Sequence, residues 1–310
     1  MAKIETSSVV VQPKKKSSLS IKANLTGWLF ASPWLIGLIV FFAIPLFSSI
    51  YFSFTTYSIL QPGEFIGLEN YKELFNDDLF WKSVYNTVYF AVLFVPLSII
   101  FGVALAMMLN MKVKGLAIYR TIYFLPTLVP HVALAVLWMW LLNPGFGLIN
   151  GTLDFFGIDG PNWLGSVKWS KPSLILMSLW GIGQAVIIYL AGLGDIPEEF
   201  YEAAEVDGAN WVQRTRHITI PLLTPVIFFN LVMGIIGAFQ QFTLPYTMTQ
   251  GQGSPANSLT FYVMYLYDNG FKFFKMGYAS AMAWILFVII MALTALIFIT
   301  SKRWVHYQGE

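Results

Sequence analysis

The sequence alternates long apolar stretches with short charged ones. Six windows contain no Asp, Glu, Lys or Arg: 23–63, 83–111, 121–153, 172–194, 217–267 and 276–301. A membrane-spanning helix needs about 20 predominantly apolar residues, and every window is longer than that. The pattern therefore predicts six transmembrane helices, at 27–53, 84–109, 118–142, 172–194, 221–249 and 277–301. The stretch from Thr249 to Pro255 is rich in turn-forming residues and is expected to be a loop.

Composition supports an all-α integral membrane protein. Of the 310 residues 57% are hydrophobic and only 11% charged, against roughly 25% charged in a soluble domain. The absence of cysteine excludes disulfides and thiolate catalysis. The three histidines are too far apart in sequence to suggest a metal site. No Gly-Lys dipeptide occurs, so the P-loop that binds ATP in many nucleotide hydrolases is absent.

The basic residues predict which side of the membrane each loop occupies. Twelve of the 18 Lys and Arg residues fall on the side of the N-terminus and six on the other side. The positive-inside rule therefore places both termini and the loops 110–120 and 195–220 in the cytoplasm. A cleaved signal peptide is the alternative for the first span. The 27–53 stretch is longer than the roughly 7–15 apolar residues of a signal peptide, which favours a membrane anchor.

Five prolines lie within the predicted spans: Pro96, Pro126, Pro130, Pro225 and Pro245. Neighbouring helices can satisfy the carbonyl groups that a proline leaves unpaired in a membrane helix. These residues therefore indicate either simple packing kinks or hinges in a bundle that changes shape.

The predicted cytoplasmic segment 195–221 has the pattern of a helix, a turn and a second helix. Asp195 and Glu198 resemble a capping box, with Pro197 in the first turn. Gly208 suits the left-handed position that ends a helix. Asn210 and Gln213 then repeat the start signal.

This first helix is unusually acidic for a loop beside a membrane. Six of the chain's 16 acidic residues lie between 195 and 207, and the anionic cytoplasmic leaflet would repel them. Phe200, Ala203, Ala204 and Asp207 fall on one narrow face at helical spacing. The small residues favour close approach by another protein, while a solvated connection between two spans remains the alternative.

The segment resembles a known family. Glu202-Ala203-Ala204, Gly208 and Ile218-x-Ile220-Pro221 are similar to the EAA signature of the membrane subunits of ATP-binding-cassette (ABC) importers, which usually have Leu-Pro at the last two positions. In that family this loop forms the coupling helix, which inserts into a cleft of the ATPase subunit. The resemblance implies six ATPase-coupling residues: Phe200, Glu202, Ala203, Ala204, Asp207 and Gly208.

Further motifs resemble the carbohydrate branch of this family. They are Phe65-x-Gly67-Leu68-x-Asn70-Tyr71 followed by Phe80-Trp81 and Asn86-Thr87, then Tyr119-Arg120 with Phe124-Leu125-Pro126, and Trp138-x-Trp140-Leu141-x-Asn143-Pro144-x-x-Gly147-Leu148-x-Asn150. The likeness is strongest to the larger maltose-permease membrane subunit. The sequence has no counterpart of the large extracytoplasmic domain inserted in that subunit, so contact with a binding protein must be made otherwise or is absent.

The resemblance implies the six-helix permease fold of binding-protein-dependent importers and the following organisation. Residues 1–26 form a cytoplasmic tail, 27–53 a first helix that wraps a partner, 54–83 an extracytoplasmic loop, 84–301 a five-helix core containing the coupling loop 195–220, and 302–310 a cytoplasmic tail. The implied partners are a second related permease, two ATPase subunits, an extracytoplasmic sugar-binding protein and membrane lipid, with no nucleic acid. ATP and magnesium would be held by the ATPase, and no cofactor is expected on this chain. The expected location is the cytoplasmic (inner) membrane of a bacterium or archaeon.

Apart from Arg120 near the start of the third, the predicted spans contain no Asp, Glu, Lys or Arg, which argues against coupling to protons or sodium and against a strongly anionic substrate. Amides and aromatic rings in the fourth and fifth spans suit sugar hydroxyls and sugar-ring faces, although hydrogen bonding between helices would explain them equally well. The maltose-permease sugar site resembles positions Ser178, Gly181, Gly237 and Gln241, where Ser178 and Gln241 replace the Asn that the family often has. Chemistry alone adds Trp180, Gln184 and Gln240 to the expected substrate pathway. His131 is expected to be a hydrogen-bonded packing residue.

These observations favour a non-catalytic subunit of an ATP-driven importer of di- or oligosaccharides. A self-contained secondary carrier or channel is one alternative, and it would transport without an ATPase. An importer of the same type with a polyol or glycerol phosphodiester as its cargo is another.

Overall fold

The computed structural model describes residues 18–111 and 113–306, so predictions for residues 1–17, 112 and 307–310 lie outside it. The described residues form helices and two isolated β-bridges, and they contain no strand. Four helical segments are long and apolar enough to cross a membrane, and six are if each of two bent pairs counts as one span. The predicted all-α, six-helix membrane fold is confirmed. The chain divides into two compact units, Met1–Tyr51 and Phe52–Glu310.

The first unit contains one helical run. Helix α1 (Ser18–Leu38) continues through a π-helical turn, η1 (Ile39–Ala43), into α2 (Ile44–Ser53). Pro45 lies in the first turn of α2, where its ring lacks the N–H that an α-helix would use. A π-helical turn is one way for the backbone to accommodate such a break. The apolar part spans Leu25–Ser53, close to the predicted 27–53.

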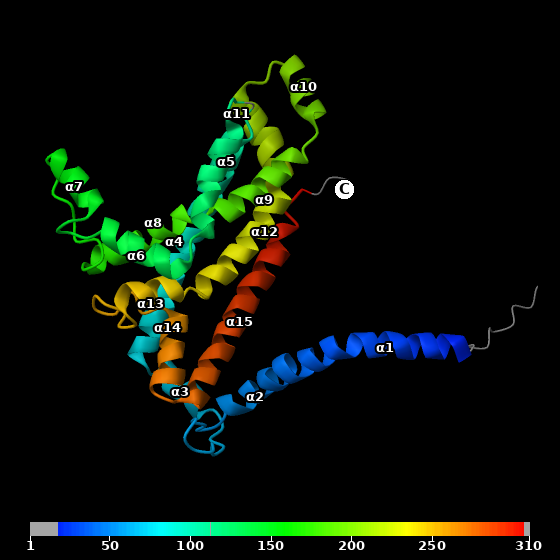
Figure 1. Ribbon diagram of the computed structural model, residues 1–310, viewed down its shortest axis with the longest axis vertical. Coiled ribbons are helices and arrows are strands. Elements are labelled where there is room, and N and C mark those ends of the chain that lie inside the picture. The colour runs from blue at the N-terminus through cyan, green and yellow to red at the C-terminus, as the bar shows by residue number, and fades with distance from the viewer. Residues whose placement is uncertain (1–17, 112, 307–310) are drawn as a thin grey trace, which may run out of the picture. The chain divides into compact units, whose positions relative to one another are not determined.

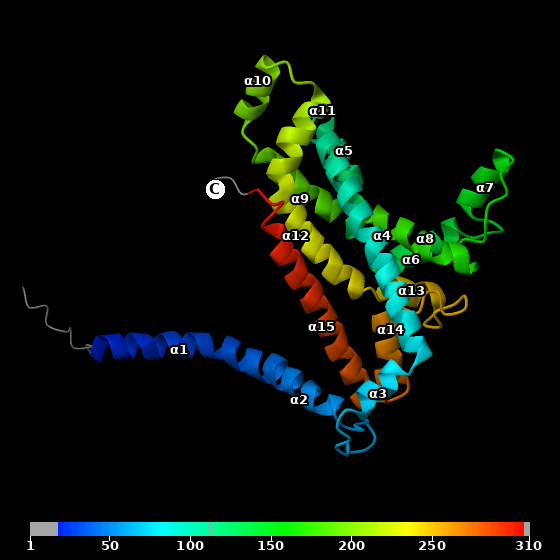
Figure 2. The ribbon, with the colours of Figure 1, turned by 180° about the vertical axis from the view of Figure 1, so that it is seen from behind.

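In the second unit, α4 (Asp78–Leu109) follows the short helix α3 (Glu69–Phe75). Helix α4 begins six residues before its predicted start because the Asp77 side chain caps it, accepting a hydrogen bond from the backbone N–H of Leu79 at 2.8 Å. It packs along α9 (Gly183–Gly194) and α12 (Ile220–Phe239), as Figures 1 and 2 show from opposite sides.

Two predicted spans are broken rather than straight. The third consists of α5 (Leu116–Phe124), the 3₁₀ turn η2 (Leu125–Leu128) and α6 (His131–Leu141), with a bend of 101° before α6. Pro130 precedes α6 in an extended conformation that stops the preceding helix. The fourth consists of α8 (Val167–Trp180) and α9, bent by 48°.

Between α6 and α8 the chain forms an arm, defined here as residues 143–166, which contains α7 (Leu148–Phe155). Figure 1 shows α7 at the ends of α6 and α8 that point away from α12. The sequence pattern predicted no helix in residues 143–166.

The fifth predicted span, 221–249, lies within one apolar helical segment, Trp211–Thr249, which starts ten residues earlier than predicted and ends at the predicted residue. Helix α10 (Glu198–Val206) leads to α11 (Trp211–Arg214), and a π-helical turn, η3 (Thr215–Thr219), joins α11 directly to α12. Helix α12 ends at Phe239, and α13 (Thr243–Thr249) follows as a separate helix. Beyond it lie α14 (Tyr262–Tyr267), the π-helical turn η4 (Asp268–Lys272) and α15 (Met276–Ser301).

The predicted loop between α13 and α14 is confirmed, and its second half, residues 258–261, is buried against α4 and α8. Asn86 in α4 donates hydrogen bonds from Nδ2 to the carbonyls of Asn257 and Thr260, at 2.8 and 2.9 Å. Its Oδ1 accepts a hydrogen bond from the Lys171 ammonium at 3.0 Å. Polar groups thereby fix the loop to two helices of the core.

Lys171 also corrects the expectation that the spans carry no charge. Helix α8 starts before the predicted span and includes this lysine, which is only 8% exposed. Its ammonium lies 4.6 and 4.9 Å from the ring centres of Tyr85 and Tyr89. These cation–π contacts and the Asn86 amide compensate for lost hydration.

Candidate functional site: a cavity between broken helices and an exposed loop helix

A cavity of about 280 Å³ lies where three helical runs are interrupted. The interruptions are at η2 and Pro130, at Gly181–Ile182 between α8 and α9, and at Gln240–Phe242 between α12 and α13. Broken helices at the centre of a membrane bundle are typical of transport sites because they expose polar backbone groups to a cavity. The lining comprises Phe90, Phe94, Pro126, Thr127, Val129, His131, Leu134, Met177, Ser178, Gly181, Gln184, Gly234, Gly237, Ala238, Gln241 and Leu244.

The close approach of α9 to the preceding span requires glycine. A Cβ atom at Gly183 would lie 2.5 Å from the carbonyl oxygen of Tyr123 and 2.9 Å from Cγ2 of Thr127. Both distances are shorter than van der Waals contact, so any side chain would push α9 away from α5 and η2. Gly183 therefore positions the cavity wall, a role that the sequence analysis did not assign to it.

Five of the seven predicted pathway residues meet at this cavity: Ser178, Gly181, Gln184, Gly237 and Gln241. The other two do not line it. Trp180 packs edge-to-face against Trp138, with ring centres 5.9 Å apart. Gln240 is exposed at the C-terminal cap of α12, because the helix ends one residue before it.

His131 does not have the packing role expected of it. It is the first residue of α6 and lines the cavity, and its ring makes no hydrogen bond among the described residues. The 101° bend before α6 brings His131 to this position. The sequence predicted a straight third span, and so did not place His131 beside the cavity.

Apart from the His131 imidazole, the polar side chains of the cavity are hydroxyls and amides. The Ser178 hydroxyl donates to the Leu174 carbonyl at 2.8 Å, so only its acceptor capacity is left for a ligand. Within the part of the chain that the structure describes, the side-chain amides of Gln184 and Gln241 have no hydrogen-bond partner. Phe90 and Phe94 add stacked rings, 4.9 Å apart, to the wall. The cavity can therefore bind a neutral polar molecule that also has apolar faces.

The loop helix α10 and its surroundings form the second candidate site. Gly208 has the predicted left-handed conformation, with φ of +76°. The N–H of Gly208 donates to the Glu205 carbonyl and that of Ala209 to the Ala204 carbonyl, at 3.0 and 2.9 Å, which closes the helix as a Schellman motif. The predicted start of the second helix is also correct, because Asn210 and Gln213 form a complete capping box.

The predicted start of α10 is wrong. Asp195 caps the end of α9 instead, and the N-cap residue of α10 is Pro197, which has no side chain that could accept a hydrogen bond. The wide turn at Ile196, a buried residue, separates the two helices. Asp195 and Glu198 therefore belong to different elements.

No residue of α10 is buried, yet the helix is fixed to the core on one side. The Tyr201 hydroxyl lies 3.0 Å from Oγ1 of Thr219, directly before α12. Arg214 forms an ion pair with Glu205 at 3.2 Å. A hollow of about 300 Å³ lies between α10 and η3, and it is lined by Ala204, Asp207, Gly208, Ala209, Gln213, Arg214, His217 and Ile218.

The six predicted coupling residues thus divide into two groups. Ala204, Asp207 and Gly208 line the hollow, while Phe200, Glu202 and Ala203 face outward and are exposed. Tyr201 and Thr219 were missed, although Tyr201 lies beside the EAA-like residues and Thr219 directly precedes Ile220-Pro221.

The comparisons with known proteins agree with this architecture. A family model described as "Binding-protein-dependent transport system inner membrane component" matches residues 98–306, which include the α10 hollow and every cavity-lining residue except Phe90 and Phe94. The chain belongs to this family, whose members are permease subunits of ABC transporters and not themselves catalytic. It is a multi-pass membrane permease.

Relatives match nearly the whole chain. A probable ABC transporter permease of Bacillus subtilis, YesP, is 44% identical over 96% of both chains. The lactose transport system permease LacF of Rhizobium radiobacter is 34% identical over 93% of this chain and 98% of its own. A chain of a bacterial alginate ABC transporter, solved in complex with an alginate pentasaccharide-bound periplasmic protein, has a TM-score of 0.82 at 24% identity. That match covers 93% of this chain and 98% of the solved one.

Proposed function

We propose that this chain is one membrane-spanning half of an ATP-driven importer of di- or oligosaccharides, and that α10 transmits the motion of an ATPase to the cavity. The observation that carries the proposal is the continuous helical run from Trp211 to Phe239, which joins the α10 region to the cavity wall. Gly234, Gly237 and Ala238 near the end of this run line the cavity. Movement at α11 therefore has a direct path to the site.

The cavity chemistry supports a sugar as cargo. Its free amides pair with hydroxyl groups, and its aromatic and glycine surfaces accept the apolar faces of sugar rings. The relative named for lactose transport favours the same substrate class. Ser178, Gly181, Gln184, Gly237 and Gln241 are the residues that we expect to contact the sugar, with Trp180 and Gln240 in supporting positions.

The energy source in this proposal is another chain. Two ATPase subunits hold ATP and magnesium, a second related permease forms the other half of the pathway, and an extracytoplasmic sugar-binding protein delivers the cargo. A ligand shifts a conformational equilibrium only through unequal contacts with the two states. The exposed faces of α10 at Phe200, Glu202 and Ala203 are where the ATPase makes those contacts.

The test is uptake and ATP hydrolysis by the reconstituted complex carrying Gly208→Val or Glu202→Lys. Both variants should insert normally and retain ATPase activity but lose sugar uptake. Gly208→Val removes the Schellman closure of α10, and Glu202→Lys removes the negative charge from the proposed docking face. Gly67→Val and Glu64→Lys are matched controls in the 54–83 loop. Gly67 has φ of +62° with no neighbour within 4 Å of its Cβ position, as Gly208 does, and Glu64 is exposed as Glu202 is. Uptake unchanged in both α10 variants would refute the coupling role.

The family favours this importer over a self-contained carrier or channel. The purified chain in proteoliposomes should move no sugar without its ATPase, whereas a carrier would. A glycerol phosphodiester cargo is disfavoured because neither Lys nor Arg lines the cavity within the described residues. A neutral polyol stays compatible with the cavity, and competition against labelled sugar uptake would detect it.

A further inference from the structure

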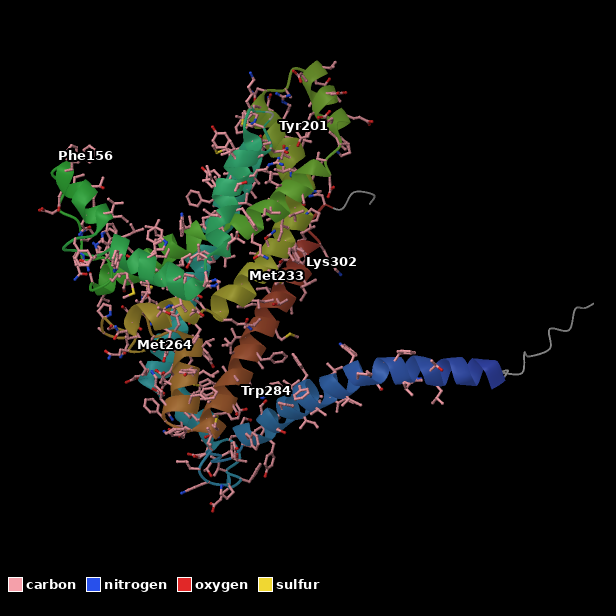
Figure 3. The ribbon with its side chains drawn as sticks, in the orientation of Figure 1. Phe156, Tyr201, Met233, Met264, Trp284 and Lys302 are labelled. Carbon is pink, nitrogen blue, oxygen red and sulfur yellow. The ribbon has the colours of Figure 1, made fainter. Side chains whose placement is uncertain are left out.

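The outer end of the arm carries large apolar side chains that the rest of the chain leaves uncovered. Phe155, Phe156 and Ile158 are 84%, 71% and 55% exposed, and the rings of Phe155 and Phe156 pack edge-to-face with their centres 5.4 Å apart. Figure 3 shows Phe156 at the far end of the arm. Contiguous apolar patches of this kind are rare on surfaces that face only water, and they indicate contact with a membrane or a protein.

The base of the arm holds this apolar tip in a fixed position. Asn150 is buried, and its Oδ1 accepts a hydrogen bond from Nε1 of Trp163 at 2.6 Å. Its Nδ2 donates to the carbonyls of Pro144 and Pro161, both at 3.3 Å. One amide therefore joins the two ends of the arm, and the tip is a built feature of the fold.

The backbone at the tip is closed by internal hydrogen bonds. Gly157 has φ of +72°, and its N–H donates to the Asp154 carbonyl at 2.9 Å. The N–H groups of Phe156 and Ile158 both donate to the Leu153 carbonyl, at 3.0 and 2.9 Å. Backbone donors that enter a bilayer must be paired internally, because lipid tails offer no acceptor. The tip meets that requirement at these three residues.

The side chains at the tip also suit lipid better than a protein partner. They are Phe and Ile, whereas the residues that dominate protein interfaces are Trp, Tyr and Arg. Trp140 and Trp169 are exposed near the base, on the helices that flank the arm, and tryptophan is enriched where a membrane meets water. The exposed carboxylates of Asp154 and Asp159 would remain on the water side.

We propose that the tip of the arm, formed by Phe155, Phe156 and Ile158, inserts into the interfacial region of the outer leaflet, with lipid acyl chains as its occupant. The outer leaflet follows from the predicted topology. The flanking helices α6 and α8 carry the cavity residues His131 and Ser178. Insertion of the tip therefore fixes that wall of the cavity to the bilayer while α12 moves.

A fluorescence-quenching experiment tests the insertion directly. The chain has no cysteine, so Phe156→Cys introduces the only thiol, which is labelled with bimane. The full chain is placed in phosphatidylcholine nanodiscs containing lipids spin-labelled on the acyl chain. A zwitterionic lipid is chosen because anionic headgroups would repel the two carboxylates. Val206→Cys in α10, 89% exposed, is the matched control outside the membrane.

The lipid label should quench bimane at residue 156 at least about twofold more than bimane at 206, while aqueous iodide should show the opposite order. Phe155→Cys repeats the measurement in case one substitution disturbs folding. Quenching of 156 by iodide and not by lipid would overturn the proposal. So would protection from both quenchers in the assembled importer, because a protein would then cover the tip. Neither outcome depends on the proposed coupling role of α10, so insertion and coupling can fail separately.

Discussion

Asp77 shows how a single residue joins distant parts of this chain. It caps α4 and also accepts hydrogen bonds from the hydroxyls of Tyr265 and Tyr278, which lie 188 and 201 residues further along. Burial raises the pKa of Asp77, but these bonds and those from the N–H groups of Leu79 and Phe80 outweigh it. The pKa therefore lies below the ordinary value of 3.8. Burial and the same hydrogen bond raise the pKa of Tyr265 to about 12.

This lowered pKa predicts acid sensitivity. The ionised carboxylate is preferred in the folded state, so its contribution to stability is complete above the unfolded pKa of about 3.9 and is lost as the pH falls through the folded value. Asp77→Asn keeps a good helix cap but removes the titration. Thermal unfolding of the detergent-solubilised chain should show the wild type losing more Tm than this variant between about pH 6 and pH 3. An equal loss in both proteins would show that Asp77 is not the responsible group.

At the scale of elements, the contact between α9 and α5 depends on Gly183. Gly183→Ala places a Cβ against the Tyr123 carbonyl and should destabilise the chain by about 1–3 kcal/mol, as overpacked cores do. Gly194→Ala at the other end of α9 is the matched control, because its Cβ position has no neighbour within 4 Å. Thermal unfolding should show a lower Tm for Gly183→Ala alone. Equal Tm values would mean that the crossing tolerates a side chain.

The link between α10 and α12 rests on the hydroxyls of Tyr201 and Thr219. Tyr201→Phe keeps the ring and removes one hydrogen bond, worth about 0.5–1.5 kcal/mol, so sugar uptake per ATP hydrolysed should fall about 2–10-fold. Tyr119→Phe, at an exposed tyrosine of α5, serves as the control. Unchanged coupling in Tyr201→Phe would assign transmission to other contacts of α10.

Local sequence signals predicted the end of α10 and the start of α11 correctly. The left-handed Gly208 and the Asn210–Gln213 box depend only on residues next to each other in the chain, so a reader of the sequence can find them. The 101° bend before α6 is different. Pro130 signals a break, but its angle is set by packing between distant helices, which also explains why the position of His131 was missed.

The residues of the cavity were predictable mainly through the family resemblance, and its shape was not. Of the five predicted residues that line it, Ser178, Gly181, Gly237 and Gln241 were implied by the resemblance, and only Gln184 was chosen for its chemistry. Gln240 and Trp180 are adjacent in sequence to lining residues but point elsewhere once α12 and α8 end. Tertiary burial of residues 258–261 and of Lys171 gave no sequence signal, since both depend on contacts with Asn86, far away in the chain.

At the scale of the whole molecule, the charge distribution acquires a structural explanation. Within residues 18–111 and 113–306, most charged side chains lie at helix ends and in loops, and the cavity lining has no Asp, Glu, Lys or Arg among these residues. The acidic helix α10 remains exposed on the side of the chain where an ATPase is proposed to dock. A neutral pathway driven from outside by another chain is consistent with both features.

The central claim is that ATP-driven motion at α10 opens the cavity. Gly237→Cys tests it most directly, because this exposed cavity glycine has no neighbour within 4 Å of its Cβ position and the chain has no other thiol. A membrane-impermeant thiol reagent is added from the extracytoplasmic side of proteoliposomes containing the importer with cysteine-free partners. Labelling should be about tenfold faster with ATP and vanadate than without nucleotide, and Gly208→Val should abolish the difference. A labelling rate independent of nucleotide, or a nucleotide effect that survives Gly208→Val, would contradict the account.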